Sequence, residues 1–365
     1  MSRTRGIGRY SRNLLAAFAR RAPADVSWTL LTLRNFAPAD PSPLPPHRTR
    51  ATLRLRRPEL TMLALDPLLL PFELAGQGDL YHSVQLGLPA IRRSPAILTI
   101  HDLAPLRWPS HYLRLPYARI GHAWQYALAK RADAIIAVSE ATKADVVARL
   151  GIPAERIHVI PEAVDTSFDP PSHADGASIA RERFGVPGRY VLYVGQFDPR
   201  KNMDGLFAAF ARAADQDREL RLVIVGTLGK LAGLMRAALA RSRLDPARVV
   251  VAGGVDDATL AALYAGAECL LHAAWLEGFG LTALEALAAG TPVVGYRAGA
   301  VAEVVGDAGV LVDDRDPDAL GEALVTLLRD ASLLTDLRAR AKPRSALFSW
   351  DRAADDTIAV YRTLI

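Results

Sequence analysis

The stretch from Trp275 to Gly295, W-L-E-G-F-G-L-T-A-L-E-A-L-A-A-G-T-P-V-V-G, restricts the fold of this chain more than any other. The apolar run before it, Ala267 to Ala274, suits a strand in a sheet that is covered on both faces. Gly278 and Gly280 allow a tight turn, and Leu281 to Ala289 has the composition of a helix. A strand, a glycine loop and a helix in this order present backbone amides at the carboxyl edge of a parallel sheet, where α/β proteins bind ligands.

Two glutamates belong to this stretch, Glu277 in the loop and Glu285 on the expected helix. A solvated loop residue and a helix surface charge would account for a random pair of this kind. The range from Leu281 to Gly290, however, holds no second charge, so the helix is expected to be mostly buried and its carboxylate to need partners. The context therefore favours a functional site.

This stretch resembles the Glu-x7-Glu signature of family 4 retaining glycosyltransferases, which have the GT-B fold of two facing Rossmann-like domains with parallel sheets. The resemblance implies that Glu277 acts catalytically at the donor sugar and that Glu285 binds the ribose of the nucleotide. It further implies donor contacts from the residues of the glycine loop and the helix start, namely Gly278, Phe279, Gly280 and Leu281.

Length and charge fit a protein of this kind. A chain of 365 residues, 50% of them hydrophobic, is too long for one ordinary core. We expect domains at 1–168 and 169–349, with a helix at 350–365 that packs back on the first domain, as the resemblance implies. Residues 1–168 carry 22 Lys/Arg against 13 Asp/Glu and residues 169–365 carry 22 against 26, so the first half is expected to face an anionic partner.

Nucleic acid is not the expected partner, because the arginines form no recognisable nucleic-acid-binding module. An anionic membrane surface or a phosphorylated acceptor remains. The single Cys269 reads as a core thiol and allows no internal disulfide, which favours a reducing compartment. No signal peptide and no run of about 18 apolar residues is found. The expected location is the cytoplasm, with a peripheral contact at the inner face of the plasma membrane.

The motif G-I-G-R-Y lies near the amino end and is expected to form a loop before a helix at Tyr10 to Arg20. It reads either as a plain turn or as a phosphate-binding loop. It resembles the family's first glycine loop, which implies that Gly6 and Gly8 face the donor diphosphate. Only Met1 to Thr4 precede R-G-I-G-R-Y, too few for a strand of about 5 to 6 residues. We therefore expect the first strand of the N-terminal domain to be missing and that domain to be the less stable one.

His101 follows the expected strand Ala96 to Ile100. It reads either as a capping residue in an ordinary turn or as an active-site residue at a strand end. The segment T-I-H-D-L-A-P-L-R-W-P resembles the family's His-Asp loop, which implies that His101 contacts the donor sugar and acts catalytically. The chain departs from the commoner form at Glu162 and Ala163, where Asn and Gly are usual.

The sequence G-Q-F-D-P-R-K-N, Gly195 to Asn202, follows the expected strand Tyr190 to Val194. Arg200 offers a planar fork and Lys201 a compact point charge, the two kinds of cation that bind a diphosphate. An ordinary surface loop is the alternative on charge alone. P-R-K-N resembles the family motif closely, which implies donor-binding and catalytic roles for both cations.

Three further segments carry expectations. Arg48 to Arg57 alternates basic and apolar residues, and the apolar stretch Leu60 to Leu74 follows it. One interpretation is an exposed strand followed by a core helix. The other is a surface that binds anionic lipid headgroups. Tyr112 to Arg131 is expected to be one long helix. Asp169 to Gly176 has the composition of a hinge.

The sequence predicts a retaining, metal-independent glycosyltransferase that moves a mannose-, rhamnose- or glucose-like sugar from a nucleoside diphosphate sugar to a hydroxyl of a glycan or lipid-linked glycan, in cell-surface polysaccharide synthesis. No cofactor is expected besides the donor substrate, and no His/Cys cluster has the spacing of metal ligands. Two alternatives stay open, a nucleotide-sugar epimerase of the same fold and a catalytically silent sugar-nucleotide-binding protein.

Overall fold

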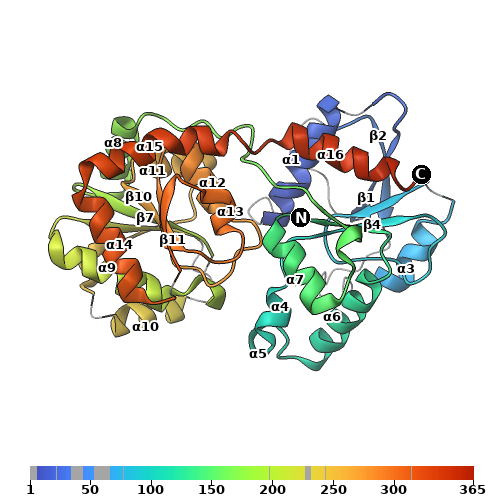
Figure 1. Cartoon of the computed structure of the whole chain (residues 1–365), viewed down its shortest axis with the longest axis horizontal. Coiled ribbons are helices and arrows are strands. Elements are labelled where there is room, and N and C mark those ends of the chain that lie inside the picture. Colours follow the sequence, from blue (N-terminus) through green and yellow to red (C-terminus); the bar gives the residue numbers. More distant parts are fainter. Residues whose placement is uncertain are drawn as a thin grey trace. The chain divides into compact units, whose positions relative to one another are not determined.

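The computed structural model describes residues 6–21, 23–33, 44–52, 66–76, 78–196, 198–226, 232–242, 244–313 and 315–365. The chain divides into two compact units (Figure 1). The first unit comprises Met1–Glu162 with Ser349–Ile365, and the second comprises Ala163–Phe348. The division after Glu162 lies a few residues before the expected boundary at residue 168.

The first unit contains a parallel sheet of strand order β3-β4-β5-β6 and a separate parallel pair, β1-β2. The strands are β1 Trp28–Leu33, β2 His47–Thr52, β3 Tyr81–Ser83, β4 Ala96–Ile100, β5 Ala134–Ala137 and β6 Ile157–Val159. The helices are α1 Gly6–Arg21, α3 Asp66–Glu73, α4 Ala104–Arg107, α5 Pro109–Tyr112, α6 Pro116–Ala129, α7 Glu140–Leu150 and α16 Trp350–Arg362, with a 3-10 turn η2 at Ala154–Arg156.

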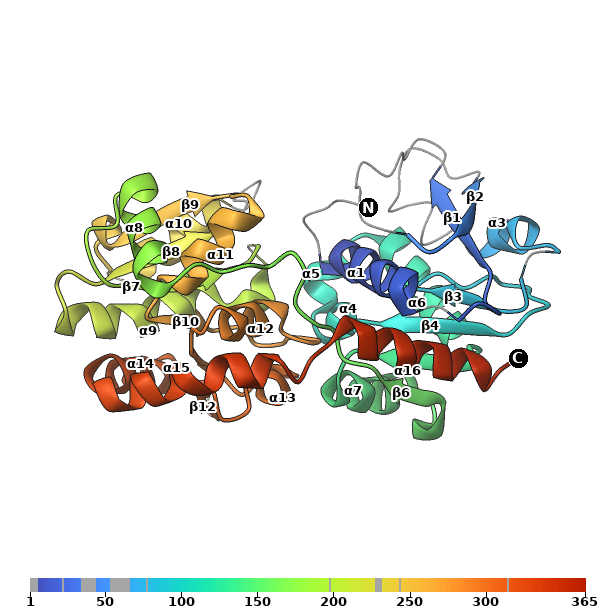
Figure 2. The ribbon, with the colours of Figure 1, turned by 90° about the horizontal axis from the view of Figure 1, so that it is seen from above.

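One face of this sheet is covered by α6 and α7. Alternate residues of β4, Ala96, Leu98 and Ile100, join Tyr126 of α6 and Val146 of α7 in one buried cluster. Figures 1 and 2 show α16, near the end of the chain, lying beside α1 at its start. Two ion pairs of 2.6 Å, Arg20–Asp351 and Arg21–Asp355, connect the two helices. The C-terminal helix is therefore part of the first unit.

The helical boundaries differ from expectation in two places. Gly6 and Gly8 do not form a loop, because α1 begins at Gly6 and contains both. The single helix expected over Tyr112 to Arg131 is wrong at its start. Leu115 is extended, as the residue before a proline tends to be, and Pro116 then occupies the first position of α6.

The second unit is built on a six-stranded parallel sheet of order β12-β11-β10-β7-β8-β9. Its strands are β7 Tyr190–Val194, β8 Arg221–Val225, β9 Val249–Gly253, β10 Cys269–His272, β11 Val293–Tyr296 and β12 Gly309–Val312. Its helices are α8 His173–Phe184, α9 Met203–Gln216, α10 Ala232–Arg241, α11 Asp257–Ala265, α12 Leu281–Ala288, α13 Val301–Val305, α14 Pro317–Arg329 and α15 Ala331–Ser345, with 3-10 turns η3 at Pro199–Lys201 and η5 at Pro246–Arg248.

The core of the second unit lies between this sheet and helices α9, α10 and α14. Cys269 and Leu271 of β10 point into it together with Phe207 and Phe210 of α9. Burial raises the pKa of the Cys269 thiol, so the side chain is a neutral core residue. The expectation of a core thiol is confirmed.

The hinge expected over Asp169 to Gly176 is wrong in its second half. Helix α8 already begins at His173, where the Ser172 hydroxyl accepts a hydrogen bond from the Asp175 amide. Gly176 serves packing rather than flexibility: a Cβ there would lie 2.5 Å from the carbonyl oxygen of Ala262 on α11. The glycine in this polar segment therefore lies where α8 packs closely against α11.

Some expectations fall on residues outside the described ranges. The first-strand question concerns residues 1–5, and residues 53–57 and 60–65 of the two segments 48–57 and 60–74 lie there too. Within the ranges that the structure covers, no helix is long and apolar enough to cross a membrane.

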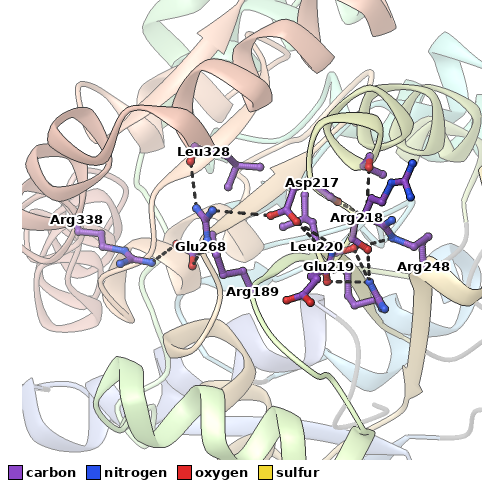
Figure 3. A network of polar contacts seen from close by, with 11 residues as sticks. Arg189, Asp217, Arg218, Glu219, Leu220, Arg248, Glu268, Leu328 and Arg338 are labelled. Atoms are coloured by element: carbon purple, nitrogen blue, oxygen red, sulfur yellow. Dashed lines mark hydrogen bonds and ion pairs between the residues drawn. The ribbon is translucent and has the colours of Figure 1, made fainter.

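A polar network fills the amino edge of the second sheet (Figure 3). Glu268, directly before β10, is 8% exposed and accepts hydrogen bonds from Arg189 at 3.0 Å and from Arg338 of α15 at 2.8 Å. Arg248 donates to the carbonyl oxygens of Asp217 and Leu220, which lie in the connection between α9 and β8. The carboxylate of Glu268 thus joins the start of β10 to α15.

We expect Glu268→Ala to lower the free energy of unfolding of the second unit by about 2 kcal/mol, because two charge-assisted hydrogen bonds are lost. Urea denaturation measures this. Asp313→Ala is the matched control, since it removes the Arg297–Asp313 pair, 2.6 Å long but with side chains 51% and 78% exposed. Equal losses in the two variants would contradict a structural role for Glu268.

Candidate functional site

The loop between β10 and α12 lies at the carboxyl edge of the second sheet and is almost entirely buried. Gly280 has φ +105° and precedes α12 with no side-chain cap, so the first amides of the helix depend on other partners. Phe279 is 5% exposed, and its ring contacts Phe348 at 5.7 Å. The loop is thus held in place by packing.

Glu277 lies at the centre of this loop and is 7% exposed. Its Oε1 accepts a hydrogen bond from Lys201 Nζ and lies 3.2 Å from His272 Nε2, while its Oε2 lies 4.0 Å from Arg200 Nη1. Burial acts to raise the pKa of Glu277, but Lys201, His272 and Arg200 outweigh it and hold the pKa well below its ordinary value. Glu277 is therefore ionised.

Two backbone contacts fix the position of Glu277. Its carbonyl oxygen accepts a hydrogen bond of 3.1 Å from the amide of Ala300. Gly299, with φ +58°, passes so close that a Cβ there would lie 2.2 Å from the same oxygen. Only glycine fits at that position.

Arg200 and Lys201 reach Glu277 because β7 and β10 are neighbours in the sheet, so the loops after them meet. The amide of Trp275 donates to the carbonyl oxygen of Arg200 at 2.7 Å and ties the two loops together. Asp198 caps η3 by accepting from the Arg200 amide at 3.1 Å, and its carboxylate lies 3.7 Å from Arg200 Nε. The two cations thus face the carboxylates of Glu277 and Asp198.

Glu285 lies on the second turn of α12 and is 2% exposed. Its Oε2 accepts a hydrogen bond of 2.9 Å from the hydroxyl of Tyr264, a fully buried residue of α11. The expectation that this carboxylate needs partners is confirmed. Its position is fixed by helix packing and by a neutral donor, unlike that of Glu277.

In the first unit, His101 directly follows β4. Its Nδ1 lies 3.1 Å from Glu162 Oε1 and its Nε2 lies 3.0 Å from the carbonyl oxygen of Val84. The ring of Tyr10, on the second turn of α1, packs edge-on against it at 4.7 Å. The residue of the glycine motif that contacts His101 is thus Tyr10. Gly6 is exposed and Gly8 is half-buried in the helix.

Sequence reasoning missed three residues of these clusters: His272, Tyr10 and Glu162. A signal existed for each. His272 is a polar residue at the end of an apolar strand, Tyr10 completes the glycine motif, and Glu162 was noted only as a departure from the family. Their pairing depends on contacts between separate strands and loops, which spacing along the chain does not reveal.

A cavity of about 450 Å³ lies elsewhere, at the amino edge of the second sheet. Its charged lining residues are Asp215, Arg218, Arg221, Asp245 and Arg248. Arg221 and Arg248 donate to backbone carbonyl oxygens between residues 214 and 220, as Figure 3 shows for Arg248, so they close the end of α9. The candidate site is at the opposite, carboxyl edge. In the described part of the chain no three His, Cys, Asp or Glu residues gather as metal ligands would.

Both halves of the chain are similar to known glycosyltransferases. The first half, residues 4–168, matches the family "Glycosyltransferase Family 4", and residues 178–344 match "Glycosyl transferases group 1". O-antigen chain mannosyltransferase B of Escherichia coli is 29% identical over 78% of this chain and 74% of its own length. A D-inositol 3-phosphate glycosyltransferase of Salinispora arenicola is 32% identical over 79% of this chain and 69% of its own.

Among solved structures, sucrose-phosphate synthase of Thermosynechococcus elongatus superposes with a TM-score of 0.77 and 25% identity, over 99% of this chain and 94% of its own. Two α/β units with parallel sheets and this likeness define a GT-B fold. The chain belongs to the group 1 glycosyl transferases of glycosyltransferase family 4, and its reaction class is glycosyl transfer.

Proposed function

We propose that this protein transfers a mannose-, rhamnose- or glucose-like sugar from a nucleoside diphosphate sugar to a hydroxyl group of a glycan or lipid-linked glycan, with retention of configuration and without a metal ion. The observation that carries the proposal is the buried, ionised Glu277 with Lys201, Arg200 and His272 around it. The names of the mannosyltransferase and the inositol-phosphate glycosyltransferase support sugar transfer to hydroxyl-bearing acceptors.

The chemistry requires stabilisation of the negative charge that grows on the departing diphosphate. Lys201 has three N–H donors and uses one on Glu277, and the guanidinium of Arg200 presents a fork suited to phosphate oxygens. Fixed cations at a buried position lower the barrier without reorganisation during the reaction. In this proposal they bind the diphosphate, and Glu277 orients Lys201 while facing the donor sugar.

Glu285 is proposed to bind the ribose hydroxyls. A carboxylate accepts hydrogen bonds, which ribose hydroxyls donate, and the Tyr264 hydroxyl helps to orient this carboxylate. The buried helix α12 sets the position of the carboxylate before any ligand arrives. Such a contact is made equally in the ground state and in the transition state, so it contributes to affinity rather than to turnover.

The proposal is tested by donor turnover with and without sugar acceptors, in the wild type and in two variants. Glu277→Ala is expected to lower kcat by about a hundredfold or more, and Glu285→Ala to raise KM for the donor by about tenfold. Turnover without any acceptor, yielding an altered nucleotide sugar, would instead indicate an epimerase. Binding without turnover would indicate a silent binding protein.

The diphosphate assignment has a separate test. Replacing Arg200 and Lys201 together by alanine removes charge-assisted bonds worth about 1.5 to 3 kcal/mol each. Affinity for a nucleoside diphosphate is expected to fall at least a hundredfold, while affinity for the matching nucleoside changes little. Calorimetric titration measures both. Equal losses for the two ligands would exclude phosphate binding by this pair.

We also propose that the first unit contacts an anionic membrane. Helix α3 exposes Leu68 by 52% and Phe72 by 77%, and Ile91 is 74% exposed. The amide of Ala90 donates to the carbonyl oxygen of Pro67 at 2.8 Å, which brings this second segment beside α3. The exposed Arg93 lies two residues after Ile91, so apolar side chains and a cation occur together, as contact with anionic headgroups requires.

Phe72→Ala is expected to weaken binding to phosphatidylglycerol vesicles several-fold, because a large exposed apolar side chain is lost. Co-sedimentation with vesicles measures it. The control is Val251→Ala, which truncates an apolar residue 39% exposed in the second unit. Equal binding to uncharged phosphatidylcholine vesicles, or equal effects of both variants, would contradict the proposal.

A further inference from the structure

The pair formed by His101 and Glu162 has an unusual hydrogen-bond pattern. His101 Nδ1 lies 3.1 Å from a carboxylate oxygen of Glu162, and Nε2 lies 3.0 Å from the carbonyl oxygen of Val84. A carbonyl oxygen accepts hydrogen bonds and cannot donate them, and the same is true of an ionised carboxylate. Both ring nitrogens must therefore carry a proton, and the ring is an imidazolium.

The groups around His101 agree with this charge. Burial acts to lower the pKa of His101, but the hydrogen bond and charge of Glu162, the Val84 carbonyl and the neighbouring Asp102 together raise it above 6.5. His82 of β3 faces it, and burial together with the charge of His101 lowers the pKa of His82 to about 3. Tyr10 of α1 contributes only a neutral ring, because burial raises the pKa of its hydroxyl. One histidine is charged and its neighbour is not.

This pattern leaves His101 without a proton to offer. Each N–H group is already bound to an acceptor of the protein, so a sugar hydroxyl could accept from the ring only by displacing one of them. The acceptor that remains is Glu162 Oε2. Glu162 is 4% exposed, and its Oε2 is buried with no hydrogen-bond partner among the described residues. An ionised oxygen in such surroundings is costly until a donor binds it.

We infer that Glu162 is a sugar-binding residue of the first unit, with a separate task for each carboxylate oxygen. Oε1 holds His101 in its charged form, and Oε2 accepts a hydrogen bond from a hydroxyl group of a bound sugar. His101 is then a positioning residue for Glu162 rather than a direct sugar contact. The sugar part of the inference rests on the proposed function.

The chemistry selects the ligand class at this point. A carboxylate oxygen accepts hydrogen bonds from hydroxyl groups and repels phosphate. Glu162 is therefore suited to the sugar part of a nucleotide sugar or of an acceptor.

The first test concerns protonation and needs no substrate. Glu162→Gln keeps the size of the side chain and removes its charge; its amide can donate to Nδ1 once that nitrogen has lost its proton. Once the charge of Glu162 is removed, burial is the main influence on His101, so its pKa is expected to fall by about 1 to 3. Nitrogen NMR of the histidine rings, recorded against pH, measures it. Glu155→Gln, an exposed change in the same unit, is the control. An unchanged titration of His101 overturns the inference.

The second test concerns the ligand. Calorimetric titration compares UDP with UDP-glucose and GDP with GDP-mannose in both proteins. In the pair that the wild type binds, we expect Glu162→Gln to weaken binding of the nucleotide sugar by about tenfold. Binding of the nucleoside diphosphate without a sugar is expected to stay unchanged. Equal effects on both members overturn the assignment of Oε2, although the proposed function survives. If the wild type binds no nucleotide sugar, the proposed function and the Oε2 assignment both fail. The His101 titration still decides the task of Oε1.

Circular dichroism and urea denaturation exclude misfolding as the cause of any change. Glu162→Asp is the second variant: it keeps the charge and shortens the side chain, so His101 is expected to stay charged while sugar binding weakens. A neutral His101 in Glu162→Asp would overturn the division of tasks between the two oxygens.

Discussion

The buried carboxylate of Glu277 is the constraint on which the second unit depends. An ionised group that is 7% exposed must be compensated by charges and hydrogen-bond donors within reach. Lys201 and His272 supply direct contacts with it and Arg200 a longer one. These groups come from the ends of β7 and β10 and from the loops that follow them. The carboxylate therefore requires that β7 and β10 be adjacent in the sheet.

The surrounding backbone is adapted to the same requirement. The hydrogen bond from the Trp275 amide to the Arg200 carbonyl oxygen holds the two loops in register, and Gly299 admits the chain after β11 to van der Waals contact with Glu277. Trp275 also stacks on Tyr296 of β11 at 5.3 Å. Three neighbouring strands thus converge on one ionised group, and a substitution at any of these contacts would disturb the position of the others.

The strands that carry the site could be predicted closely, because each is an apolar run with turn residues at both ends. β4 and β7 have the expected bounds, and β10 lies within the expected run Ala267 to Ala274 but is shorter at both ends. Arg200 and Lys201 of P-R-K-N lie beside Glu277, the first glutamate of Glu-x7-Glu. Composition failed where a residue had a tertiary task. Gly176 looked like part of a hinge but admits a helix crossing, and α13, β12 and α15 gave no distinct signal within the acidic and Ala/Leu-rich C-terminal region. The partners His272 and Glu162 could not be found from spacing, since each pairing depends on tertiary structure.

Each unit contains a histidine paired with a buried glutamate, yet the two pairs differ in their surroundings. His272 Nε2 lies 3.2 Å from Glu277 Oε1, and its Nδ1 is buried with no hydrogen-bond partner among the described residues. His101 has an acceptor on both sides and must be charged. In the second unit the cation in direct contact with the glutamate is Lys201, which has three N–H donors and uses one of them on Glu277, whereas in the first unit the cation is the ring itself and both of its N–H groups are used. The same pair of residue types therefore leaves N–H donors suited to phosphate beside the glutamate of the second unit, and a carboxylate oxygen suited to hydroxyl groups in the first unit.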